Sequence, residues 1–83
     1  MKLSRTAEAT KEWLISYLAH ALQIPKDKID IDASFDNFGI DSVAAAAMMG
    51  DLAKWLGAEV DPVVVFEYPT IAQLAARVTE GSR

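Results

Sequence analysis

Hydrophobic residues recur at helical spacing near the start of the chain. Over about 5–22 they fall at i, i+1, i+4, i+5, i+8 and i+9, namely Trp13, Leu14, Tyr17, Leu18, Ala21 and Leu22. This spacing puts them on one face of a helix and does not fit a strand, in which alternate residues share a face. Pro25 restricts the residue before it and ends the run. A first helix is therefore predicted over about 5–22.

A second stretch, over about 42–56, has the same periodicity. Its recurring apolar residues are Ala45, Met48, Met49, Leu52 and Leu56. Gly57 follows directly, at the position where a glycine in left-handed conformation closes many helices. The pattern predicts a second helix whose recurring residues face inward.

Two shorter helices are predicted after it. Asp61 followed by Pro62 matches a helix cap with proline at the first helical position. This pair predicts a short helix over 63–67. Thr70, with a glutamine three residues later, matches a capping box and predicts a last helix over about 71–79.

The connector over 26–41 breaks the helical pattern but is not typical of a disordered linker. It holds five aspartates and two lysines, which sum to −3, and it also holds Ile29, Ile31, Phe35, Phe38 and Ile40. Disordered linkers are poor in such side chains. We therefore expect an ordered loop pinned to the core. The fold class predicted for residues 1–83 is a single all-α domain of four helices, with a long first loop and a short third helix.

Composition excludes several classes of function. The 83 residues include no cysteine, so the chain offers neither a disulfide framework nor a thiol nucleophile. A net charge of −4 argues against binding nucleic acid, which requires clustered Lys and Arg. The longest uncharged apolar stretch, residues 13–24, is shorter than the ~18 residues of a membrane span. We expect a small acidic domain in the cytoplasm, with no membrane or nucleic-acid partner.

Catalytic and metal-binding groups are few. His20 is the only histidine, and although Ser42 and an aspartate complete the residue types of a catalytic triad, nothing in their spacing supports one. The connector's acidic residues Asp27, Asp30, Asp32 and Asp36 lack the glycine and terminal glutamate of a calcium-binding loop. We expect a solvated acidic loop, no metal and no enzymatic activity.

Ser42 differs from other polar residues because it opens the helix predicted over 42–56. Its hydroxyl lies beside unpaired backbone N–H groups at the positive end of the helix dipole, a place that suits an attached phosphate. Gly39 permits a tight turn that would leave the serine exposed. From Asp41 and Ser42 alone, an ordinary helix cap remains the stronger interpretation.

Three segments, in order, resemble the acyl carrier proteins. They are Gly-Ile-Asp-Ser-Val at 39–43, Trp-Leu-Gly at 55–57 and Val-Phe-Glu-Tyr-Pro-Thr-Ile at 65–71, and the likeness extends from the first helix to Val78. The resemblance implies a four-helix carrier bundle in which Ser42 receives 4′-phosphopantetheine from coenzyme A. It also implies that Asp41 helps to position the transferase or its metal. The third segment is typical of polyketide-synthase carriers, and residues 49–57 resemble carriers that follow fatty acyl-AMP ligases.

The resemblance also implies the partners. A phosphopantetheinyl transferase would load the chain, and ketosynthase, acyltransferase or fatty acyl-AMP ligase enzymes would use it, with the carrier as a monomer. Met1 favours a discrete protein over an excised synthase domain. The acyl group and the pathway stay open. The alternative function is a small helical interaction module without a covalent cofactor, in which Ser42 is only a cap.

One departure from the family concerns the docking surface. Many carriers have a glutamate five residues after the serine, where this chain has Ala47. The predicted outer side of helix 42–56 is smooth and mostly apolar, with Val43, Ala44, Ala47 and Gly50. We expect partners to dock there through apolar contact, with steering from the acidic loop and Glu67; alternatively, the alanines merely fill a helix surface.

Trp55 is expected to pack at the edge of the core, with partner docking as the alternative.

Overall fold

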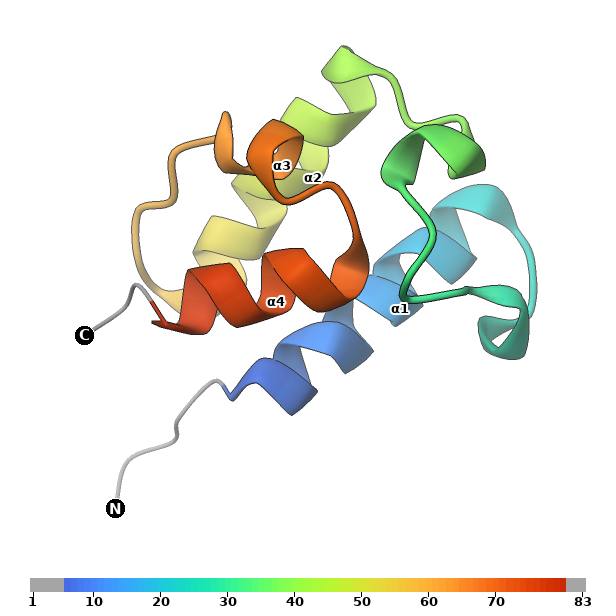
Figure 1. The fold of residues 1–83 in the computed structure, drawn as a ribbon, viewed down its shortest axis with the longest axis horizontal. Coiled ribbons are helices and arrows are strands. Elements are labelled where there is room, and N and C mark those ends of the chain that lie inside the picture. Colours follow the sequence, from blue (N-terminus) through green and yellow to red (C-terminus); the bar gives the residue numbers. More distant parts are fainter. Residues whose placement is uncertain (1–5, 81–83) are drawn as a thin grey trace.

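The computed structural model of the protein describes residues 6–80, apart from the side chain of Glu80. Four α-helices follow one another along the chain: α1 (Ala7–Leu22), α2 (Ser42–Leu56), α3 (Val64–Glu67) and α4 (Ile71–Glu80) (Figure 1). Two short 3₁₀ turns, η1 (Lys26–Lys28) and η2 (Phe35–Phe38), lie in the loop between α1 and α2. Over residues 6–80 the structure forms no strand, only an isolated bridge between Ser34 and Thr70. The all-α prediction is confirmed.

The first helix begins at a cap that the hydrophobic pattern did not single out. Thr6 accepts a hydrogen bond from the Ala9 N–H at 3.0 Å, so α1 starts at Ala7. The prediction had placed the start near residue 5, which lies outside the described residues. At the other end Gln23 takes a left-handed conformation (φ 58°) and closes α1 two residues before Pro25.

The buried face of α1 is rotated slightly from the predicted one. Leu14 and Leu18 are fully buried, and Trp13, Tyr17 and Leu22 pack against the core from its edge. Ala21, which was predicted on the inner face, is exposed, and Ala19 is buried in its place. The helix packs against α4, and with Leu14 and Leu18 buried, Ala21 at the edge of the predicted stripe is left on the solvent side.

The core lies between α1, α2 and α4. Its largest fully buried side chains are Leu14, Leu18, Met48, Met49, Leu52, Ile71, Leu74 and Thr10. The threonine is satisfied because its hydroxyl donates to the Thr6 carbonyl at 2.8 Å. Within the described part of the chain no helix has the length and apolar character needed to cross a bilayer.

The acidic loop is ordered, as predicted. Ile29 and Phe35 are buried, and Ile31, Phe38 and Ile40 pack against the core cluster. Backbone bonds fasten the loop to the start of α4: the Phe35 N–H donates to the Pro69 carbonyl at 2.8 Å, and the Ala72 N–H donates to the Ile31 carbonyl at 3.1 Å. The chain that leads into α2 is therefore held in place.

The last two helices follow their predicted signals with one shift. Thr70 accepts from the Gln73 N–H at 3.1 Å and caps α4 as expected. By contrast, α3 starts at Val64, one residue later than predicted, because the Asp61 carboxylate accepts from the Val63 N–H at 3.1 Å. That bond forms an Asx turn ahead of the helix and does not cap it directly.

Candidate functional site

A tight turn leads the chain into α2. Gly39 ends η2 with φ 77°, a left-handed conformation that favours glycine. Its N–H donates to the Asp36 carbonyl at 3.0 Å, and the next N–H, that of Ile40, donates to the Phe35 carbonyl at 3.2 Å. Since Phe35 is buried, the turn is tied to the core, and the predicted role of Gly39 in exposing the next residues is supported.

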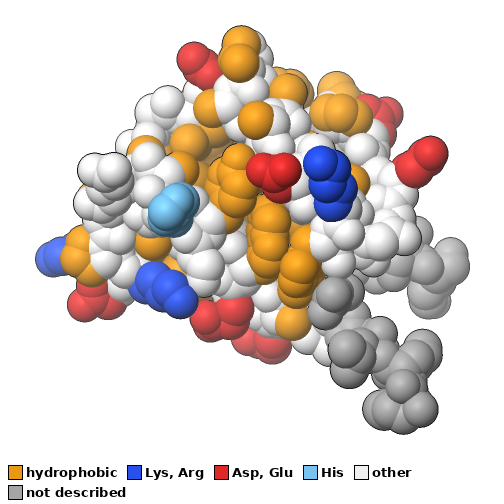
Figure 2. All heavy atoms as spheres, turned by 180° about the vertical axis from the view of Figure 1, so that it is seen from behind, with side chains coloured by type: hydrophobic (Ala, Val, Ile, Leu, Met, Phe, Trp, Pro, Cys, Tyr) orange, Lys and Arg blue, Asp and Glu red, His pale blue; other side chains and the backbone are white. Residues whose placement is uncertain are grey.

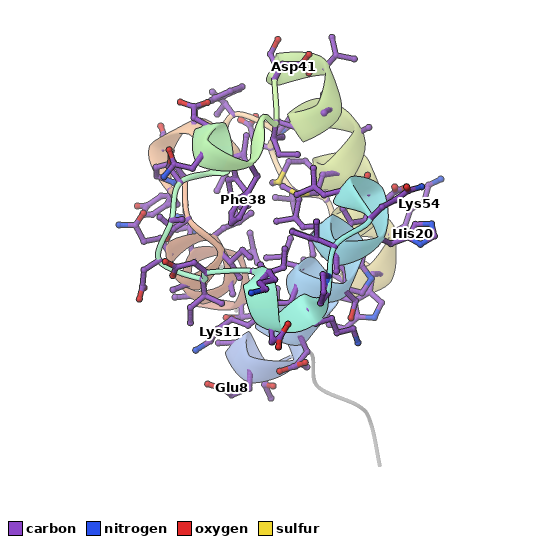
Figure 3. All side chains as sticks on the ribbon, turned by 90° about the vertical axis from the view of Figure 1, so that its right-hand side faces the viewer. Glu8, Lys11, His20, Phe38, Asp41 and Lys54 are labelled. Atoms are coloured by element: carbon purple, nitrogen blue, oxygen red, sulfur yellow. The ribbon has the colours of Figure 1, made fainter. Side chains whose placement is uncertain are left out.

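Asp41 caps α2. Its carboxylate oxygen accepts from the Ala44 N–H at 2.8 Å, and its carbonyl accepts from the Ala45 N–H at 2.8 Å. The residue has extended backbone angles (φ −86°, ψ −177°), which are typical of an N-cap. Figure 3 shows Asp41 at the end of α2 that points away from the rest of the bundle.

Ser42 is the first residue of α2, and its side chain is exposed. The N–H groups of the first helical turn have no carbonyl four residues earlier within the helix, and they point toward the same end as the positive pole of the dipole. A singly charged phosphodiester on the Ser42 oxygen would be stabilised there. The neighbouring Val43 is 77% exposed, so both residues at the start of α2 face solvent. The residues present therefore fit an attached 4′-phosphopantetheine.

Among residues 6–80, His20 does not lie with Ser42 and Asp41 in a catalytic triad. His20 is exposed in the last turn of α1, and Figure 3 shows it far from Asp41, the neighbour of Ser42. The loop aspartates 27, 30, 32 and 36 are all exposed, and the Asp30 carboxylate accepts from the Asp32 N–H at 2.9 Å. Among residues 6–80 no group of three acidic or histidine side chains is arranged to hold a metal ion.

The outward face of α2 is almost as predicted. Val43, Ala47 and Gly50 are exposed, but Ala44 is partly buried, because it lies at the border with the inner face. Ala46, which the sequence interpretation omitted, is exposed one turn after Ser42. The helical periodicity could have identified it, since residues four apart share a face.

A second exposed apolar group lies on and before α3. Phe66 is 61% exposed and Val63 is 48% exposed, beside the exposed carboxylate of Glu67. Sequence reasoning treated residues 63–67 as a short helix without separating its faces. A single helical turn buries only part of such a run, here Val64 and Val65.

Near its C-terminal end α2 carries one aromatic residue, Trp55, which packs against aromatic residues of α1. Trp55 is partly buried and stacks on Trp13 of α1, with ring centroids 5.8 Å apart, and Trp13 stacks on Tyr17 at 5.2 Å. The prediction that Trp55 packs at the core edge is confirmed.

Burial raises the pKa of Tyr17, and the nearby Asp51 raises it further through its charge and a hydrogen bond. Figure 2 shows hydrophobic side chains in a band across the face that carries His20.

Comparison with known proteins identifies a related group. Residues 12–78 match the family model described as a phosphopantetheine attachment site. The acyl carrier protein TtuC of Teredinibacter turnerae is 42% identical over 52 residues, which are 63% of this chain and 60% of TtuC. The polyketide synthase PksL of Bacillus subtilis is 33% identical over 66 residues, which are 80% of this chain but 2% of PksL.

A solved structure of an acyl carrier protein matches the fold of this chain over its whole length. An acyl carrier protein from Anabaena sp. PCC 7120, with a variant phosphopantetheinylation-site sequence, superposes with a TM-score of 0.88 at 42% identity. The match covers 100% of this chain and 96% of that one.

Proposed function

The chain belongs to the family of phosphopantetheine-bearing carrier proteins, and from this premise we propose that Ser42 is the residue that carries the 4′-phosphopantetheine arm. Members of this family are not catalysts themselves. They hold an acyl group as a thioester at the end of the arm and present it to enzymes. Family membership also argues against the alternative function, an interaction module without a covalent cofactor.

The observation that carries the proposal is the position of the Ser42 hydroxyl. It is exposed at the N-terminus of α2, directly after a capping aspartate and a turn anchored by Phe35. In the loading reaction the Ser42 oxygen would form a bond to a phosphorus of coenzyme A, and the pyrophosphate bond would break as the nucleotide leaves. The serine proton would go to a base of the transferase. A base supplied by the transferase is consistent with the position of His20, which is remote from this end of α2 (Figure 3).

Asp41 has two proposed roles. Its hydrogen bond to Ala44 orients the first turn of α2 and thereby positions Ser42. Its exposed carboxylate also lies where it can meet the transferase or a metal ion that the transferase brings. The two roles can be separated, because asparagine keeps the capping oxygen but removes the charge.

We further propose that the carrier acts in a polyketide or fatty-acyl pathway. The relatives that support this are TtuC, an acyl carrier protein, and PksL, a polyketide synthase. Its enzymes would be of the ketosynthase, acyltransferase or fatty acyl-AMP ligase classes. They would contact Val43, Ala47 and Gly50 on α2, with Glu67 providing electrostatic steering.

Loading by a transferase tests the assignment of Ser42. The protein is incubated with coenzyme A and a promiscuous phosphopantetheinyl transferase, and its intact mass is measured. We expect wild type and Ser16→Ala to gain one phosphopantetheine group and Ser42→Ala to gain none. Ser16 lies on α1, so this variant is a matched serine control. Loading of Ser42→Ala, or no loading of the wild type by several transferases, would contradict the proposal.

A further inference from the structure

We infer that Thr70 is a positioning residue for the loading of Ser42. By capping α4, Thr70 holds in place the loop that leads into Ser42, and it acts on the loading reaction through that loop. The inference rests on the proposed attachment at Ser42. It also gives a role to the end of segment 65–71, one of the three stretches that resemble the acyl carrier proteins.

The start of α4 holds the loop by backbone hydrogen bonds. The Pro69 carbonyl, just before the helix, accepts from the Phe35 N–H at 2.8 Å, and the Ala72 N–H, in the first helical turn, donates to the Ile31 carbonyl at 3.1 Å. Thr70 itself pairs with the loop through the isolated bridge described above. Figure 1 shows the loop running past the start of α4. The position of the loop therefore depends on the conformation of this one turn.

Thr70 fixes the conformation of that turn. Its hydroxyl oxygen accepts from the Gln73 N–H at 3.1 Å, and its carbonyl accepts from the Leu74 N–H at 2.8 Å. A cap of this type satisfies an N–H group that the helix leaves free at its beginning. Without the hydroxyl the first turn of α4 would fray. The Pro69 carbonyl and the Ala72 N–H would then no longer be held where the loop needs them.

A short series of bonds joins this turn to the serine. Phe35 is buried, and its carbonyl accepts from the Ile40 N–H at 3.2 Å. Ile40 lies two residues before Ser42, and Asp41 between them caps α2. Two hydrogen bonds, at Phe35 and Ile40, and two peptide bonds therefore connect the Pro69 carbonyl to Ser42. A displacement at the start of α4 would reach the serine by this route.

The cap of α1 provides a matched control. The Thr6 hydroxyl accepts from the Ala9 N–H at 3.0 Å, which is the arrangement found at Thr70. Over residues 6–80, however, the first turn of α1 makes no backbone hydrogen bond to the loop 26–41. Thr6→Ala and Thr70→Ala should each lower the melting temperature by about 4 to 8 °C. A difference in loading between them would therefore not come from stability.

Loading kinetics with coenzyme A and a phosphopantetheinyl transferase, measured well below the melting temperatures, test the inference. A shift of about 1 Å in a reacting group can cost ~100-fold in rate, so a shift of a few tenths of an ångström should lower kcat/KM of Thr70→Ala about 3-fold. Thr6→Ala should load within 2-fold of the wild type. Thr70→Ser keeps the hydroxyl and should do the same. Thr70→Gly lacks the hydroxyl but costs a helix little stability, and it replaces Thr70→Ala if that variant does not fold.

Amide hydrogen exchange, followed by NMR, reports on the loop without the transferase. The Ile40 N–H should exchange about 5-fold faster in Thr70→Ala than in the wild type, because a lost cap changes a local opening equilibrium by about that factor. In Thr6→Ala its exchange should be unchanged. Equal exchange of Ile40 in the wild type and Thr70→Ala would show that Thr70 does not hold the loop, and the inference would be wrong.

The outcomes separate this inference from the assignment of Ser42. If Thr70→Ala loads within 2-fold of the wild type, or if Thr6→Ala loses as much activity as Thr70→Ala, the positioning role is wrong and the attachment at Ser42 stands. A loss that Thr70→Ser does not restore also overturns the inference, because the hydroxyl is then not the cause. If no transferase loads the wild type, it is the proposed function that fails.

Discussion

The two sides of α2 are built from similar residue types but have different surroundings. On the inner side Ala45, Met48, Met49 and Leu52 are all buried. On the outer side Val43, Ala47 and Gly50 are exposed to solvent. Both sets are apolar or small, so hydrophobicity alone does not distinguish them.

The difference between the sides is one of size. Long flexible side chains fill the core, and the outer side carries no residue larger than valine over its first nine positions. Exposed helix positions of small domains commonly hold Lys or Glu, which are soluble and favour the helix. An outer surface kept small and uncharged contributes little to folding. We therefore expect substitutions on the inner side to change stability and those on the outer side to change partner use.

The aromatic contact at the edge of the inner side should show the largest effect on stability. Replacing Trp55 by alanine removes a partly buried ring that stacks on Trp13. Because fully buried Trp→Ala changes cost about 3–5 kcal/mol, a loss of about 2 kcal/mol in the free energy of unfolding is expected here. Denaturant titration measures it. The loading rate of the folded fraction should stay that of the wild type.

A double-mutant cycle separates stacking from simple burial. Trp13→Ala and the double variant complete the cycle, and a coupling of about 0.5–1.5 kcal/mol is expected for a stacked pair. If Trp55→Ala instead keeps its stability but loses the activity of one partner enzyme, Trp55 belongs to the docking surface. The expectation that inner-side substitutions change stability and outer-side substitutions change partner use would then be wrong.

The capping residue Asp41 precedes both sides of α2, and its replacement should have a smaller effect on stability than that of Trp55. Asp41→Ala removes the bond to the Ala44 N–H and should cost about 1 kcal/mol, measured by thermal or denaturant unfolding. Asp41→Asn should cost much less, because the amide oxygen still accepts that bond. Both variants lack the carboxylate, so slow loading of both would show that the transferase requires the negative charge at position 41. Normal loading of the asparagine variant would leave Asp41 as a cap alone.

Most of the fold could be predicted because its signals are local. Gly57 takes the left-handed conformation (φ 72°) that was expected at the end of α2, and Thr70 caps α4. The errors occur where tertiary packing decides. Ala21 was placed on the inner face, yet which edge of the α1 stripe is buried depends on the angle at which α1 meets α4. A one-dimensional pattern does not contain that angle.

The candidate site was harder to predict from its own residues. An Asp-Ser pair before a helix is common as a cap, and the structure confirms that Asp41 is one. The proposed attachment at Ser42 comes from the resemblance of the wider sequence to carrier proteins. The exposure of Phe66 escaped prediction because a helix of one turn, such as α3, has no periodicity from which to separate its faces.

The substitution Ala47→Glu on the outer side of α2 should have the smallest effect on stability. It is also the most direct test of the difference between the two sides. Glutamate there would lie four residues before Asp51, and like charges at that spacing cost about 0.2–0.5 kcal/mol, which denaturant titration should only just resolve. Partner use should nevertheless fall, because a desolvated charge would face an apolar enzyme surface. Glutamine at position 47 separates the charge from the size of the side chain. Unimpaired loading and partner turnover of Ala47→Glu, or a steep loss of wild-type turnover with added salt, would contradict apolar docking and favour an ion-steered complex.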